Sequence, residues 1–339
     1  MSSLRLPTRY APDAAFFALL IFLFACAALG CSTAPYHAQL EVQPYAPAQH
    51  EVEPREEAAS EVEPAQLRYV VMPMNPRPGD PITIGVNAGF GVESALLVMG
   101  QRRFGRSRFF PVACEDSGRS FYATLLTVPT TAGMGSATIV LETAEGIAAE
   151  IPLEIAHRMF LHESIPVTTA PVAATGAFWA SITDMESETR FLDAFVRPVG
   201  AARRSSPFGA RRIFIGANGV RSNLIHAGID YAVPTGTPVL ASGSGRVMLA
   251  RYQRVAGNSV IIEHLPGVFS IYYHLDSIGV REGDMIEVGA VLGHSGNTGF
   301  STGPHLHWEV RVFGEVTDPD ALVARPLIDK TDIFSRLGY

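Results

Sequence analysis

Cysteine is scarce in this 339-residue sequence, which contains only Cys26, Cys31 and Cys114. The first two lie in or beside an apolar run over residues 14–29, so Cys114 alone remains for the rest of the chain. An intramolecular disulfide in a mature chain is therefore excluded unless Cys31 stays free. Packing must supply much of the stability, and the 47% of hydrophobic residues are enough for two cores in a chain of this length.

The sequence also lacks a second long apolar run and an excess of basic residues. Beyond residues 14–29, no run reaches the about 20 apolar residues that a membrane-spanning helix requires. The formal net charge is -7, of which residues 32–66 carry -6 and residues 1–31 carry +1, leaving -2 for residues 67–339. Because phosphate binding needs a clustered basic surface, this nearly neutral body argues against nucleic acid as a partner.

The first 31 residues have the pattern of a secretory signal. Arg5 and Arg9 precede the apolar run, and Gly30 and Cys31 follow it. A small residue before a cysteine at this place resembles a bacterial lipobox, which would make Cys31 the lipidated first residue of the mature protein. We therefore expect a signal peptide over residues 1–31 and an exported protein, anchored by lipid to a bacterial membrane and facing the periplasm or the cell exterior.

Two features leave alternatives to this interpretation. Lipoboxes usually carry leucine three residues before the cysteine, where this chain has Ala28, and Cys26 with Leu23 before it is a second candidate. An uncleaved anchor and an ordinary cleaved signal are the other possibilities.

Residues 32–66 form an acidic linker. They contain seven glutamates, five prolines and Arg55 as the one basic residue, with a quasi-repeat of EVQP at 41 and EVEP at 51 and 61. Such a composition buries too little apolar surface to fold, so we predict a disordered, extended tether. At about 3.1 Å per residue, a proline-rich chain of this length reaches about 100 Å from a lipid anchor.

The body of the chain is expected to be mainly β, in two domains. In residues 67–155, six short β-type runs alternate with turn signals such as RPGD and TAEG, which predicts a β-sandwich that also resembles an immunoglobulin-like domain. Residues 156–199 are read as a connecting segment with one helix near 183–195, because Thr183 and Glu186 have capping-box spacing. Residues 200–325 return to β runs, and residues 326–339 are read as a C-terminal tail.

Four histidines and one aspartate in the last third of the chain carry the chemistry: His226, Asp230, His274, His305 and His307. Side chains alternate along a strand, so His305 and His307 point to one side, about 7 Å apart along the backbone. His226 and Asp230 would span about 13 Å on a straight strand, whereas ligands of one zinc place their donor atoms within about 3.5 Å of each other. We therefore expect the chain to bend between them, at Gly228.

These residues lie in blocks that resemble the lysostaphin-like, LytM-type zinc endopeptidases, which cut peptide bridges in bacterial cell walls. The matching blocks are SPFGARR (206–212), HAGIDYAVPTGTPVLASGSGRV (226–247), IYYHL (271–275), GHSGNTGFSTGPHLHWEV (293–310) and TDP (317–319). The resemblance implies an antiparallel β catalytic domain with one Zn²⁺ per chain. It also implies that His226, Asp230 and His307 are the metal ligands, with water in the fourth position, and that His274 and His305 are catalytic.

Three protein ligands leave a zinc site open, and the metal lowers the pKa of bound water to about 7. Imidazole has an unperturbed pKa near 6.5, so His274 and His305 suit proton transfer, although the sequence does not assign their separate roles. We expect a zinc endopeptidase that hydrolyses peptide cross-links or stem peptides of peptidoglycan. The alternative is an inactive relative that binds the wall or activates another hydrolase. A third possibility, compatible with activity, is a surface lipoprotein whose sandwich domain mediates adhesion.

Other polar residues near these motifs receive weaker interpretations. Glu309 shares a strand face with His307, so either a hydrogen bond to that ligand or exposure to solvent is compatible with the pattern. His264 and His294 are read as structural or surface residues. The loop over residues 213–225 is expected to form one wall of a substrate groove, and Leu265-Pro266-Gly267 is expected to form a hairpin turn.

Overall fold

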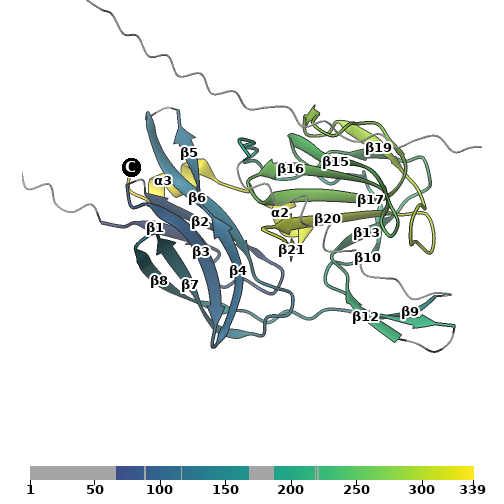
Figure 1. Ribbon diagram of the computed structural model, residues 1–339, viewed down its shortest axis with the longest axis horizontal. Helices are drawn as coiled ribbons and strands as arrows, with labels where there is room; N and C mark the ends of the chain where they lie inside the picture. Colours follow the sequence, from purple (N-terminus) through teal and green to yellow (C-terminus); the bar gives the residue numbers. More distant parts are fainter. Residues whose placement is uncertain (1–65, 88, 116, 168–186, 218, 220) are drawn as a thin grey trace, which may run out of the picture. The chain divides into compact units, whose positions relative to one another are not determined.

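A computed structural model describes residues 66–87, 89–115, 117–167, 187–217, 219 and 221–339. Residues 1–31, with Cys31, and residues 32–65 of the expected linker lie outside the described residues. The described residues group into one compact unit. As expected, the described chain is mainly β (Figure 1). Among the described residues, no helix has the length and apolar character needed to cross a membrane.

The first part of the described chain is a sandwich of two four-stranded antiparallel sheets. One sheet has the order β1 (Tyr69–Met72), β2 (Pro81–Asn87), β6 (Arg119–Thr127) and β5 (Phe110–Cys114). The other has the order β4 (Arg102–Arg108), β3 (Val92–Met99), β7 (Gly135–Thr143) and β8 (Gly146–Ile155). Apolar side chains from both sheets, among them Ile84, Leu97 and Ile139, form one buried cluster. The sequence predicts six of these strands but not β4 and β5.

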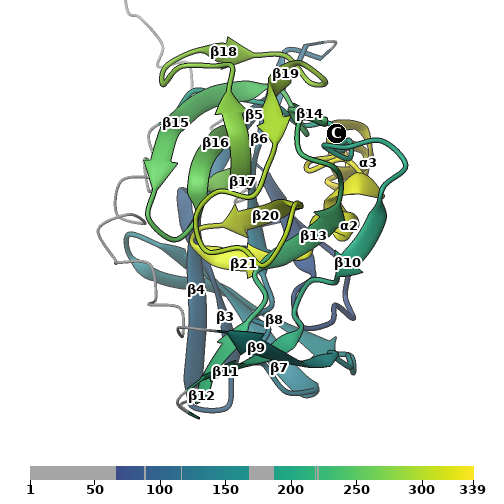
Figure 2. The same ribbon diagram turned by 90° about the vertical axis from the view of Figure 1, so that its right-hand side faces the viewer.

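The second part is built on a large antiparallel sheet, whose central strands lie side by side in Figure 2. Its main path is β10 (Arg203–Ser206), β13 (Gly228–Ala232), β20 (Leu306–Val312), β17 (Val268–Ile278), β16 (Gly257–Leu265), β15 (Gly245–Gln253) and β18 (Met285–Ile286). Three short strands join it at the side: β14 (Pro238–Leu240), β19 (Val291–Ser295) and β21 (Glu315–Thr317). The predicted hairpin at residues 265–267 joins β16 to β17, and Gly267 supplies its positive φ of 76°.

A separate three-stranded sheet has the order β12 (Arg221–Ile225), β11 (Arg211–Gly216) and β9 (His162–Val167). Strand β9 comes from the expected connecting segment and pairs parallel with β11. The expected loop over residues 213–225 is therefore largely a β-hairpin, since β11 and β12 pair antiparallel from Arg211 to Ile225.

Two other sequence expectations are wrong. Residues 187–195 are not helical, and residues 183–186 lie outside the described residues. In place of a helix, the backbone N–H groups of Phe191 and Phe195 donate to the carbonyl oxygens of His264 and Leu322, so tertiary contacts replace helical hydrogen bonds. The segment 326–339 is not a loose tail. It follows α2 (Pro319–Val323), contains α3 (Lys330–Arg336), and buries Ile333 and Leu337 completely.

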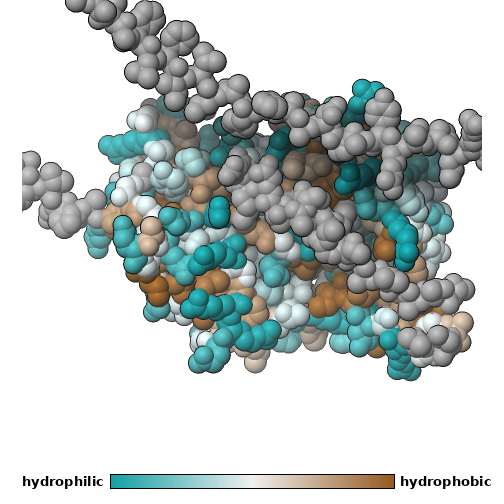
Figure 3. Space-filling view, in the orientation of Figure 1, coloured by the Kyte–Doolittle hydropathy of each residue, from teal (hydrophilic) through white to brown (hydrophobic). Residues whose placement is uncertain are grey.

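The C-terminal segment also contacts the sandwich. The side chain of Ile333 lies against Gly85 in β2, and Thr83 Oγ1 donates to the carbonyl oxygen of Leu327 at 3.2 Å. Hydrophobic residues are interspersed among hydrophilic ones over the face shown in Figure 3.

Strand β20 positions the functional residues. All of its residues except Arg311 are buried, and Leu306, Trp308 and Val310 enter the largest hydrophobic cluster. Because side chains alternate along a strand, His307 and Glu309 take the opposite face. The packed core therefore fixes the strand from which these two polar side chains project.

Candidate metal and catalytic site

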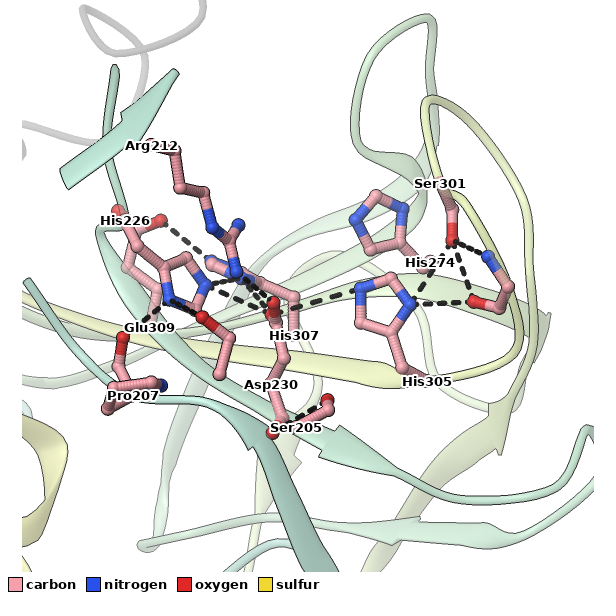
Figure 4. A network of polar contacts seen from close by, with 12 residues as sticks. Ser205, Pro207, Arg212, His226, Asp230, His274, Ser301, His305, His307 and Glu309 are labelled. Carbon is pink, nitrogen blue, oxygen red and sulfur yellow. Dashed lines mark hydrogen bonds and ion pairs between the residues drawn. The ribbon is translucent and has the colours of Figure 1, made fainter. Parts of the chain in front are cut away.

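The three expected metal ligands meet between β13 and β20. His226 lies in the short connection between β12 and β13, Asp230 lies within β13, and His307 lies within β20. Asp230 and His307 are direct partners in the antiparallel register. The structure thus brings together residues that are up to 81 positions apart in the sequence. Figure 4 shows their side chains converging on one point.

Their donor atoms are close enough to share one ion. His226 Nε2 lies 3.0 Å from Asp230 Oδ1 and 3.1 Å from His307 Nδ1, and those last two atoms are 2.9 Å apart. All three residues are buried. Among the described residues, they form the group whose donor atoms lie close enough together to hold a metal ion. Two imidazole nitrogens and one carboxylate oxygen are the donor set of many open zinc sites. The residues therefore fit zinc.

The remaining nitrogen of each ligand histidine is also held. His226 Nδ1–H donates to the carbonyl oxygen of Pro207 at 2.8 Å, and His307 Nε2–H donates to Glu309 Oε2 at 3.3 Å. Such bonds fix the tautomer and the ring orientation of metal-ligating histidines. Glu309 is buried and paired with Arg311, so the hydrogen-bonding interpretation of Glu309 is confirmed and the solvent-exposed one is wrong.

The cluster favours positive charge. Burial by itself raises the pKa of Asp230, but hydrogen bonds from His226 and His307 hold it well below its usual value. Burial by itself lowers the pKa of His307, yet hydrogen bonds to Asp230 and Glu309 outweigh it and raise this pKa to about 9. For His226 burial dominates and its pKa is lowered. Two buried carboxylates, Asp230 and Glu309, thus favour a cation at this place, either a proton on His307 or a metal ion in exchange for it.

Gly228 is needed for a different reason from the one expected. The chain turns at residues 226–227, where β12 has ended and β13 has not yet begun. Gly228 pairs with Glu309, and a Cβ atom on it would lie 2.2 Å from the carbonyl oxygen of Trp308. Close approach of two backbones, rather than a left-handed conformation, therefore requires glycine here.

His274 and His305 lie beside this cluster, with their ring centroids 4.7 Å apart. His274 belongs to β17 and has a positive φ of 62°, uncommon for a residue other than glycine. His305 lies just before β20 and forms an isolated bridge with Gly296. Its Nε2 atom is 3.8 Å from Asp230 Oδ1, so its ring faces the metal ligands.

Backbone carbonyls set the tautomers of both rings. His274 Nδ1 lies 2.8 Å from the carbonyl oxygen of Thr298, and His305 Nδ1 lies 2.8 Å from that of Gly303. Carbonyl oxygens only accept, so Nδ1 carries the proton in each ring and Nε2 of the neutral ring is a base. Burial, aided by the neighbouring His305 and His307, lowers the pKa of His274 to about 3, so this ring is neutral near pH 7.

Two residues without an expected role complete the surroundings of Asp230. Arg212 Nη2 donates to Asp230 Oδ2 at 2.5 Å, and Arg212 Nε donates to Glu163 Oε2 at 3.0 Å. Arg212 stands in a block that shows the family resemblance, which is the signal that could have singled it out. Glu163 has no comparable signal, because its place depends on the parallel pairing of β9.

The other described histidines are structural or surface residues outside the candidate site. His264 is fully buried and bonds Ser270 Oγ at 2.7 Å and the carbonyl oxygen of Ser244 at 2.8 Å, which confirms a structural role. His294 is exposed and contacts Ser277. His157 and His162 are exposed, and His37 and His50 lie outside the described residues.

Comparison with known proteins agrees with this geometry. Residues 224–319 match the family model of Peptidase family M23. The chain is 42% identical over 124 residues to the DD-carboxypeptidase/endopeptidase Mpg of Neisseria meningitidis, a match over 37% of this chain and 28% of that protein. It is 44% identical over 112 residues to the peptidoglycan DD-endopeptidase ShyA of Vibrio cholerae, a match over 33% of this chain and 25% of that protein.

The match thus spans only about a quarter of the length of these two relatives. A crystal structure from Pseudomonas aeruginosa assigned to peptidase M23 covers 73% of this chain and 94% of its own, at 25% identity and a TM-score of 0.50. The part of the chain that matches the model of peptidase family M23 holds all five of these residues: His226, Asp230, His274, His305 and His307.

Proposed function

We propose that this protein is a zinc-dependent endopeptidase that hydrolyses peptides of bacterial peptidoglycan, with one zinc ion per chain. The observation that carries the proposal is the convergence of three donor atoms within 3.1 Å of one another, beside the two rings of His274 and His305. We assign the metal to His226, Asp230 and His307, and the catalytic roles to His274 and His305.

Zinc in such a site lowers the pKa of water and polarises a carbonyl group. The chain supplies the rest. One of the two rings, through its Nε2 atom, accepts a proton from the attacking water and passes it to the departing amine, because Nδ1 of each ring is committed to a carbonyl oxygen. Once it holds that proton, the same ring donates a hydrogen bond to negative charge that develops on the substrate oxygen.

The substrate follows from the relatives. Mpg is named a DD-carboxypeptidase/endopeptidase and ShyA a peptidoglycan DD-endopeptidase. We therefore propose peptidoglycan cross-links as the substrate class and the DD bond as the first to test. The alternative is an inactive relative that binds the wall or activates another hydrolase. Degenerate relatives lose functional positions, whereas all five are present in this chain, which favours the active enzyme.

The test uses the chain from Glu61 onward, loaded with zinc and incubated with purified peptidoglycan. Mass analysis of the released fragments should show cleaved cross-links, and a His305→Ala variant of equal zinc content should release far less. If the zinc-loaded wild type were inactive on peptidoglycan of every cross-link type while still binding to it, the wall-binding alternative would replace this proposal.

We also propose that Cys31 is lipidated and that residues 32–66 tether the folded part at a distance from the membrane. The support is the order of basic residues, apolar run and Gly30-Cys31 in the sequence. Replacing Cys31 with serine should release the protein into the soluble fraction. A variant that stayed membrane-bound and labelled by fatty acid would point to Cys26 instead.

A further inference from the structure

Glu163 lies outside the region matched by the family model, yet it reaches the surroundings of the metal ligands. It belongs to β9, which pairs parallel with β11, and its direct partner in that register is Arg212. The Glu163 carboxylate accepts from Arg212 Nε at 3.0 Å and from Ser206 Oγ at 2.7 and 2.9 Å. The side chain of Glu163 is 23% exposed and that of Arg212 is 15% exposed. The pair therefore lies at the edge of the buried site.

Arg212 donates a hydrogen bond to one of the two carboxylate oxygens of Asp230. Asp230 Oδ1 faces both ligand histidines, whereas Oδ2 is bonded to Arg212 Nη2. A planar guanidinium held at two of its nitrogens cannot turn freely, so it fixes the rotation of the carboxylate that it binds. Asp230 is therefore directed to offer Oδ1 alone to a metal ion.

Glu163 reduces the electrostatic cost of placing a cation beside Arg212. An arginine beside a site for a divalent cation repels the ion, and a second carboxylate on the far side of the guanidinium offsets that repulsion. Glu163 also holds Ser206, whose neighbour Pro207 accepts the Nδ1–H bond of His226. One side chain thus supports two of the three ligands, Asp230 through Arg212 and His226 through the backbone at Ser206-Pro207.

We propose that Glu163 is a positioning residue of the zinc site, supplied by a strand that precedes the family M23 region, and that it acts on Asp230 through Arg212. This inference rests on the metal site of the proposed function. It assigns to β9 the task of completing that site rather than only joining two domains.

The test measures the zinc dissociation constant of the full chain by competition with a chelator. Changes in the outer partners of metal ligands typically weaken metal binding about 10- to 100-fold. Glu163→Gln keeps the size of the side chain and an acceptor for Ser206 but removes the charge, so zinc binding should weaken at least about 10-fold. The matched control Glu150→Gln removes an exposed carboxylate from β8 and should leave the zinc constant unchanged.

Arg212→Lys is the second variant. Lysine keeps the charge but cannot bridge Asp230 and Glu163 with a planar fork, so zinc binding should also weaken. In the double variant Glu163→Gln/Arg212→Lys the two losses should not add, because both act through one chain of contacts. Thermal unfolding of each metal-free variant shows whether the fold is kept.

Either folded variant with wild-type zinc affinity would overturn the inference, and if Glu163→Gln failed to fold, Arg212→Lys would decide. Additive losses would also count against it. A wild type that bound no zinc would instead refute the proposed function, so the two failures are distinguishable.

Discussion

Asp230 and His307 face each other across β13 and β20, and Asp230 Oδ1 lies 2.9 Å from His307 Nδ1. The antiparallel register sets this distance, because direct partners on neighbouring strands hold their Cβ atoms about 5 Å apart. On the other face of the sheet, the neighbours Tyr231 and Trp308 are buried in the core. Packing of the core therefore holds two of the proposed metal ligands in place without a metal ion.

His307→Ala should abolish tight zinc binding. The variant loses one of three donor atoms and leaves the buried carboxylates of Asp230 and Glu309 without the histidine between them. Zinc content after dialysis, measured by elemental analysis, should fall from about one ion per chain to near zero. His294→Ala, which changes an exposed histidine, is the control. Equal zinc in His307→Ala and the wild type would contradict the assignment.

His274→Ala and His305→Ala should separate chemistry from metal binding. Neither ring belongs to the converging donor set, so each variant should keep near-full zinc occupancy. Loss of a group that transfers a proton or stabilises negative charge typically slows a reaction about 100- to 10,000-fold. We expect peptidoglycan hydrolysis at least about 100-fold slower in each. Substantial activity in a zinc-loaded variant would remove that histidine from the mechanism.

Much of the fold and the centre of the site could be predicted from the sequence, because strand alternation and motif spacing are local signals. The eight-stranded sandwich has two strands more than the six expected, β4 and β5, and β4, RRFGRSR, is not predicted because it reads as charged chain rather than as a strand. Its buried residues, Phe104 and Ser107, are too few to reveal alternation. The capping-box spacing at Thr183 likewise predicts a helix that is absent from residues 187–195, where tertiary contacts decide the backbone.

The contacts around the proposed metal ligands could not be predicted from the sequence, for a different reason. The Pro207 carbonyl, Arg212 and Glu163 reach the ligands through the path of the chain and the pairing of β9 with β11. Parallel pairing between strands far apart in the sequence leaves no periodic trace in either strand. Glu309 was the exception, because two-residue spacing from His307 already placed it on the correct face.

Gly228→Ala should destabilise the fold and weaken zinc binding together. The added Cβ would lie 2.2 Å from the Trp308 carbonyl oxygen, so β13 and β20 must move apart near Asp230 and His307. Overpacking of this kind costs about 1–3 kcal/mol in the free energy of unfolding. The control is Gly200→Ala, because a Cβ at Gly200 meets no atom within 4 Å. Denaturant unfolding and zinc competition measure the two effects. If Gly228→Ala changed neither stability nor zinc affinity, β13 and β20 would accommodate the added Cβ atom without cost, and the prediction would be wrong.

Ile333→Ala tests whether the C-terminal segment is part of the folded core. Ile333 in α3 is fully buried and packs against Gly85 of β2. Large-to-small changes at buried isoleucines cost about 2–5 kcal/mol, so the melting temperature should fall clearly. Ser335→Ala changes an exposed residue of the same helix and should alter stability by less than about 0.5 kcal/mol. Equal stability of the two variants would show that residues 326–339 do not contribute to the stability of the folded core.

His264 should make the stability of the metal-free protein depend on pH. Burial lowers the pKa of His264 to about 4, although its hydrogen bond to the Ser244 carbonyl works in the opposite direction. In the unfolded chain the same ring has a pKa near 6.5, so the unfolded state binds a proton more readily as the pH falls. The contribution of the neutral ring is therefore complete above about pH 6.5 and is lost between about pH 6.5 and 4. This difference between the folded and unfolded pKa values corresponds to about 3 kcal/mol in the free energy of unfolding.

Denaturant unfolding of the wild type and of His264→Gln, both without metal, measures this contribution. Between pH 7 and pH 4, the free energy of unfolding should fall by about 3 kcal/mol more in the wild type than in the variant. Parallel pH profiles for the two proteins would mean that another group controls acid unfolding.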